Sequence, residues 1–167
     1  AHALSYFHAQ HTDGIDYEFI VVQEGGYPEF DLLRYGPRFR ILRQGLHADC
    51  GASARDLAIR EAAGEFVAFW DDDNIYYPHA MASVLSTVSG HDVGIVRTRH
   101  QGLVIPSGPC IKSGDIDTMC FAVRRSLASR LPWVDHGGRF SDYRWITKVA
   151  ALTDRVNRSP VIIGEHL

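Results

Sequence analysis

Apolar positions along the chain follow strand-like and helix-like spacing in turn. Residues 52–63 (ASARDLAIREAA) place alanine and leucine at helical spacing with charged residues on the other faces, and Gly64 is expected to end this helix. Runs rich in β-branched and aromatic residues predict strands at 17–23, 39–42, 92–98, 118–123 and 161–163. Other helices are expected at 78–86, 126–130 and from Ser141 onward, with a loop at 101–114. This alternation predicts an α/β fold.

The stretch 65–78, EFVAFWDDDNIYYP, departs from simple alternation. Residues 66–70 are apolar at every position, which indicates a strand covered on both faces, as in a parallel sheet with helices on either side. Asp71, Asp72 and Asp73 follow directly, just past the carboxyl end of what we expect to be a central strand. Ligands of open α/β sheets bind at that edge.

Three adjacent carboxylates repel one another and raise each other's pKa, so a cation stabilises the arrangement. Hard divalent ions such as Mg²⁺ or Mn²⁺ prefer oxygen ligands and are often held by one or two carboxylates together with substrate phosphates. Asp and Asn are also ordinary turn residues. The triplet alone therefore leaves a solvated turn as the alternative to a metal site.

Composition narrows the function classes. The chain has 167 residues, 46% of them hydrophobic, and a formal net charge of -3, as expected for one domain over 1–167. No apolar run is long enough for a membrane helix, and no signal peptide is visible, so we expect a cytoplasmic protein, at most peripheral at a membrane. The 3 cysteines lack metal-ligand spacing, the 9 histidines show no HxxxH pair, and no basic run indicates nucleic-acid binding.

The run GASARDLAIREAAGEFVAFWDDDNIYYP resembles the nucleotide-sugar glycosyltransferases of the GT-A fold, family 2, with SpsA-like members the closest. YEFIVVQEGG upstream, and CIKSGDIDTMCFAVRRSL and FSDYRWITKV downstream, resemble further family segments in the same order. The resemblance runs from about Ala3 to about Val149. It implies an α/β GT-A fold, with a mostly parallel central sheet flanked by helices and without the family's first strand. Residues 1–10 look like the helix that follows that strand in the family, so the first helix is expected there. The nucleotide-binding part would be about 1–99 and the acceptor side about 100–167.

The resemblance also assigns roles to single residues. Asp73 and Asp71 would hold the metal, and Asp71, Asp72, Glu24 and Arg55 would contact the nucleotide. Asp142 would be the general base, although its place one residue after Ser141, the expected helix N-cap, also suits a simple helix-start charge.

Reserve candidates lie on the acceptor side. Asp115 and Asp117 could act as the base or bind an acceptor hydroxyl, and both could equally be loop acids. Trp133 and Tyr143 could stack on a sugar, or pack in the core.

The implied activity is an inverting, Mn²⁺- or Mg²⁺-dependent transfer of a sugar, of the hexosyltransferase type. The donor would be a nucleoside diphosphate sugar, UDP-sugar before others, and the acceptor an unidentified hydroxyl. Gln23 and Glu24 stand where the family has two aspartates, and Asp56 replaces the asparagine of its A-R-N segment. A nucleotidyltransferase of related fold and a non-catalytic carbohydrate- or nucleotide-sugar-binding remnant are the alternatives.

Overall fold

The computed structural model describes residues 2–25, 38–136, 138 and 140–167. Residue 1 of the first expected helix lies outside them. In chain order the elements are α1 (His2–His8), β1 (Phe19–Glu24), β2 (Phe39–Gln44), α2 (Ala52–Glu61), β3 (Phe66–Ala68), β4 (Ile75–Tyr76), α3 (Ala80–Val88), β5 (Val93–His100), β6 (Leu103–Ile105), the 3₁₀ helix η2 (Thr118–Cys120), β7 (Phe121–Arg124), α4 (Arg125–Ala128), the 3₁₀ helix η3 (Trp133–His136), α5 (Ser141–Ala150) and β8 (Val156–His166).

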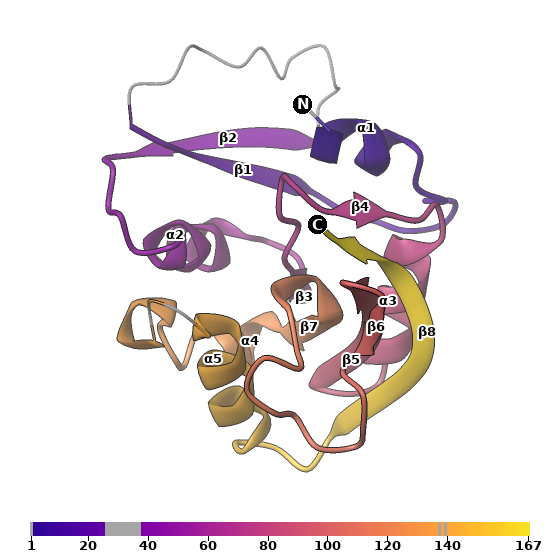
Figure 1. The fold of residues 1–167 in the computed structure, drawn as a ribbon. Helices are drawn as coiled ribbons and strands as arrows, with labels where there is room; N and C mark the ends of the chain where they lie inside the picture. The colour runs from indigo at the N-terminus through magenta and orange to yellow at the C-terminus, as the bar shows by residue number, and fades with distance from the viewer. Residues whose placement is uncertain (1, 26–37, 137, 139) are drawn as a thin grey trace.

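The strands form two sheets (Figure 1). One has the order β3-β7-β5-β8-β4, with β6 paired to β5, and the other is the parallel pair β1-β2. The α/β class expected from the pattern is confirmed. The expected mostly parallel sheet is wrong in detail, because only β5 and β8 are parallel in the larger sheet and its other pairs are antiparallel.

The strand before the acidic triplet is also not central. β3 covers only 66–68 and lies at the end of the hydrogen-bonded order. A continuous apolar run indicates that both faces of a strand are covered. It does not indicate the direction of the neighbouring strand or the position of the strand in the sheet. Phe69 and Trp70, past the end of β3, are apolar because they pack onto the core cluster.

Helices cover the larger sheet on both faces (Figure 1). Gly94 of β5 faces α3, where an added Cβ would lie 2.7 Å from the backbone nitrogen of Val88, so only glycine allows this approach. Side chains alternate along a strand, so Phe121, next to the Gly94 partner Ala122, points to the opposite face. There it packs with the buried Trp133 and Trp145.

Three local differences from the expected elements have physical reasons. The expected loop at 101–114 contains β6, three residues that only gain strand pairing through β5. Ser141 is the first helical residue and not the N-cap, because Phe140 precedes α5 with φ 63°. β8 extends from 156 to 166 despite Pro160 and Gly164, since its register against β5 shifts near the proline.

Candidate active site

The acidic loop is folded onto itself behind β3. The rings of Trp70 and Tyr76 stack with centroids 3.6 Å apart, and the Asp71 backbone N–H donates to the Tyr76 hydroxyl at 2.9 Å. Burial, with the nearby Asp71 charge, raises the pKa of Tyr76 well above its ordinary value, so its hydroxyl stays protonated. These contacts fix the direction in which the loop leaves the sheet.

The side chain of Asp71 joins three parts of the chain. Its Oδ1 accepts a hydrogen bond from Nη2 of Arg55 in α2 at 3.0 Å, and its Oδ2 accepts one from the hydroxyl of Thr118 in η2. Arg55 is itself held by the carbonyl of Cys50 at 2.9 Å, and its guanidinium lies 5.0 Å from the Trp133 ring centroid. Arg55 therefore neutralises the charge of Asp71, and the Thr118 hydroxyl adds an uncharged hydrogen bond on the other oxygen.

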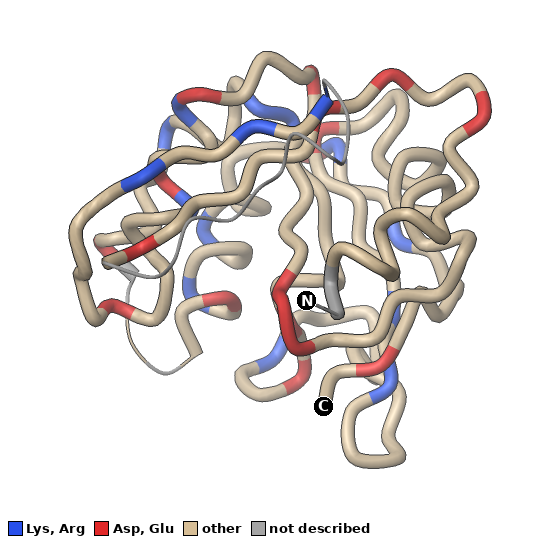
Figure 2. The backbone as a smooth tube through the Cα atoms, turned by 90° about the horizontal axis from the view of Figure 1, so that it is seen from above, with Lys and Arg blue, Asp and Glu red and all other residues tan. Residues whose placement is uncertain are grey.

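Asp117 forms a second junction next to the first. Its Oδ1 accepts a hydrogen bond from the backbone N–H of Met119 at 3.0 Å, and this bond caps the N-terminus of η2. Its Oδ2 lies 2.6 Å from Nδ1 of His166. The His166 ring meets the edge of His100 at 4.4 Å between centroids. Because Thr118 bonds to Asp71, η2 connects the end of β8 to the acidic loop. In Figure 2 the run of three aspartates is a continuous red stretch near the C-terminal end of the trace.

Asp142 approaches this junction from the start of α5. Burial raises the pKa of its carboxyl, the neighbouring charges of Asp117 and Asp71 raise it further, and the Tyr143 backbone N–H and Arg55 oppose the rise. Carboxylates from the acidic loop, from the residue that caps η2 and from the start of α5 therefore lie within electrostatic reach of one another. A carboxylate with a raised pKa is a stronger base than an ordinary one.

Asp72 and Asp73 differ from these acids because their side chains are exposed and have no hydrogen bond or ion pair with any described residue. Behind them Asn74 is buried, and its Oδ1 has no hydrogen-bond partner within the described part of the chain. The described residues contain no group of three or more His, Cys, Asp or Glu that could hold a metal ion alone. Two free carboxylates fit Mg²⁺ or Mn²⁺ when ligand phosphates complete the coordination.

The remaining predicted site residues lie in other surroundings. Glu24 ends β1, where its Oε1 accepts from Gln44 at 2.7 Å. Asp115 accepts from both the backbone N–H and the hydroxyl of Ser107, and so closes the 107–115 loop. Trp133 is completely buried, which places it in the core and leaves no open face for a sugar.

Thr118, His166 and Tyr76 contact the site, and sequence reasoning missed all three. Tyr76 lies within the stretch 65–78, five residues after Asp71, so this contact is short enough in sequence to be predicted. Thr118 and His166 contact residues that lie 47 and 49 positions away in the sequence, and no local spacing predicts such contacts.

Comparison with known proteins places the chain in a family. The sequence profile described as glycosyl transferase family 2 matches residues 7–103, more than half of the 167 residues. The chain is a member of glycosyl transferase family 2. The match contains Arg55 and the acidic loop and ends before Asp117 and Asp142. For those two residues, their closeness to Asp71 is the evidence that they belong to the candidate site. A search of curated proteins found no match.

Solved structures show the same fold. S. aureus TarS 1-349 is similar with a TM-score of 0.71 at 14% identity, over 97% of this chain and 54% of that protein. TarS 1-349 in complex with UDP has a TM-score of 0.70 at 14% identity (98% and 54% covered), and the UDP-GlcNAc complex 0.66 at 15% (98% and 53% covered).

The expected GT-A architecture is thus confirmed, and the chain spans about half the length of TarS 1-349. In the described ranges, no helix is long and apolar enough to cross a membrane.

Proposed function

We propose that this chain carries the donor site and the catalytic base of an inverting transferase that moves a sugar from a nucleoside diphosphate to a hydroxyl acceptor. The observation that carries the proposal is the convergence of Asp71, Asp117 and Asp142 with Arg55, from four separate segments. Family membership supports the reaction class, and UDP and UDP-GlcNAc bound to TarS favour a uridine donor.

The acidic loop would bind the donor diphosphate. Asp71 is oriented by Arg55 and Thr118, which leaves Asp73, with Asp72 beside it, as the carboxylate available to a Mn²⁺ or Mg²⁺ ion. Such an ion neutralises the charge that develops on the leaving diphosphate. Asp71 is a weaker candidate for a metal ligand, since both of its oxygens already accept hydrogen bonds. Glu24, at the carboxyl end of β1, is assigned to the nucleoside through the family resemblance.

Asp142 would accept the proton of the acceptor hydroxyl. Burial raises its pKa, so its ionised form is a better proton acceptor than a solvated aspartate. The hydroxyl oxygen then attacks the anomeric carbon on the face opposite the diphosphate, the bond from carbon to the diphosphate oxygen breaks, and the configuration inverts. Arg55 would hold positive charge between Asp71 and the base.

The test is calorimetric titration of the full chain with UDP and with GDP, each with and without Mn²⁺. We expect Mn²⁺-dependent binding of UDP, lost by at least tenfold in Asp73→Ala. Asp154→Ala, which removes an exposed aspartate without a described partner, is the matched control and should bind like wild type. Nucleotide binding that does not depend on the metal, or that Asp73→Ala leaves unchanged, would refute the donor-site assignment.

A further inference from the structure

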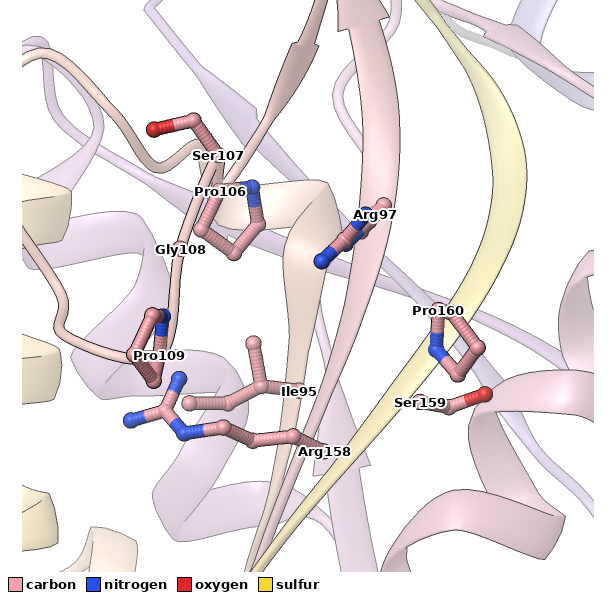
Figure 3. Close-up of a pocket in the computed structure, with 9 residues that line it drawn as sticks. All are labelled: Ile95, Arg97, Pro106, Ser107, Gly108, Pro109, Arg158, Ser159 and Pro160. Atoms are coloured by element: carbon pink, nitrogen blue, oxygen red, sulfur yellow. The ribbon is translucent and has the colours of Figure 1, made fainter.

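A pocket of about 380 Å³ lies on the face of the larger sheet opposite α3, between β5, β8 and the loop after β6 (Figure 3). We call it the arginine pocket, because Arg97 of β5 and Arg158 of β8 supply its charge. Pro106 and Pro109 form one wall, and Ser159 and Pro160 the other. No aspartate or glutamate is among the residues that line it.

The two arginines project from the same face of the sheet. Arg158 pairs with Ile95, two positions before Arg97, and residues two apart on a strand share a face. Neither guanidinium has an ion pair or side-chain hydrogen bond with any residue in the part of the chain that the structure describes. By contrast, Arg40, Arg55 and Arg124 each bind a carboxylate. Two neighbouring cations without a counter-charge repel each other, and an anion between them removes that cost.

The walls are stiff and already in place. Prolines have fixed φ angles, so ordering these walls costs little entropy when a ligand binds. The Ser107 backbone N–H donates to both Asp115 oxygens, at 2.9 and 3.1 Å, and its hydroxyl donates to Oδ2 at 2.9 Å. Figure 3 shows that hydroxyl directed away from the arginines, so the Asp115 charge is engaged outside the pocket.

We infer that the arginine pocket binds the tetrahedral oxyanion of a phosphate or sulfate group. Guanidinium groups arriving from two strands can donate to several oxygens from different directions. A tetrahedral group offers acceptors in those directions, whereas a planar carboxylate is satisfied by one guanidinium.

The arginine pocket differs from the proposed donor site in the sign of its charge and in its position in the fold. The acidic loop needs a cation before it can hold a diphosphate, whereas the arginine pocket attracts an anion without one. Arg97 lies three residues before His100, so about 10 Å of strand separates it from the ring that touches His166. The inference does not depend on the transferase proposal.

The experiment is titration of the metal-free full chain with inorganic phosphate and, separately, with sulfate, at constant ionic strength held by chloride. We expect binding in the range of about 0.1–1 mM, weakened about tenfold in each of Arg97→Gln and Arg158→Gln, as for loss of one charged hydrogen-bond donor. Tighter binding of phosphate would assign phosphate esters as the ligand class, and tighter binding of sulfate would assign sulfate esters.

Arg130→Gln is the matched control, because Arg130 is an exposed arginine outside the pocket without a described side-chain partner. It should bind the anion like wild type, and Arg97→Lys should restore part of the lost affinity because it keeps the charge. Absence of binding by wild type up to about 10 mM, or equal losses in Arg130→Gln and Arg97→Gln, would overturn the inference. Asp73→Ala should bind phosphate normally, so failure of the donor site and failure of this pocket are separable.

Discussion

The carboxylates of the candidate site fall into two groups that differ in what satisfies them. Asp71 and Asp117 are paired by the protein itself, through Arg55, Thr118 and His166. Asp72 and Asp73, next in sequence to Asp71, are exposed and have no described partner. Residues of the same type, side by side, thus have different uses: the paired acids hold the fold around the site, and the free acids are available to a ligand.

Asp142 stands between these groups, and its substitution should have the largest effect on turnover. Asp142→Asn keeps the shape of the side chain and removes its basicity, so we expect kcat for transfer or for donor hydrolysis to fall by about 10²–10⁴-fold. The melting temperature should rise by roughly 1–3 °C, because a carboxylate whose pKa is raised by burial destabilises the fold when ionised. Activity assays and calorimetry check the pair of outcomes. Unchanged turnover would remove Asp142 as the base.

Breaking the paired group should cost stability next. Arg55→Gln leaves Asp71 with only the Thr118 hydrogen bond, and both partners are mostly shielded, with 18% and 29% of their side chains exposed. We expect a loss of about 1–3 kcal/mol in the free energy of unfolding, measured by urea denaturation. A double-mutant cycle with Asp71→Asn should return a coupling energy above about 0.5 kcal/mol, and zero coupling would show that the ion pair does not stabilise the site.

The pH dependence of activity should depend on the acidic residues that lie near Asp142. A base must be ionised, so the rate falls as pH drops through the pKa of Asp142, which is raised above 3.8 by burial and by the charges of Asp117 and Asp71. Asp117→Asn removes one of those charges and should move the acid limb of the kcat profile to lower pH. A limb that stays in place would exclude electrostatic contact between the two acids.

The raised pKa of Asp142 also determines how the stability of the fold depends on pH. The folded state binds the Asp142 proton more tightly than the unfolded chain, so the stabilisation that protonation gives is full below the ordinary pKa and is lost as pH rises through the raised one. The gain in melting temperature of Asp142→Asn should therefore appear at neutral pH and vanish in acid.

The smallest effect is expected for the free acids in the absence of ligand. Asp72→Asn should change the free energy of unfolding by less than about 0.5 kcal/mol, because an exposed side chain without a partner contributes little. A larger loss, measured by the same urea denaturation, would mean that Asp72 belongs to the paired group.

Local sequence signals predicted the parts of this molecule that local physics decides. Helical spacing predicted α2, and with it the position of Arg55, while the acidic triplet after an apolar run marked the loop. The run could not show that β3 lies at an end of the sheet, since coverage of both faces is compatible with several orders. The nine histidines looked scattered, and His166 reaches Asp117 only because β8 continues past Pro160 and Gly164 along β5.

If Asp71 stabilises the fold and Asp73 binds the ligand, substituting one or the other has opposite consequences for stability and for binding. Asp71→Asn and Asp73→Asn are each titrated with UDP in the presence of Mn²⁺ and are each melted without ligand. We expect Asp73→Asn to lose at least tenfold in affinity and to keep the wild-type melting temperature, whereas Asp71→Asn should melt several degrees lower. The reverse pattern, with Asp73→Asn unstable and binding UDP normally, would contradict it.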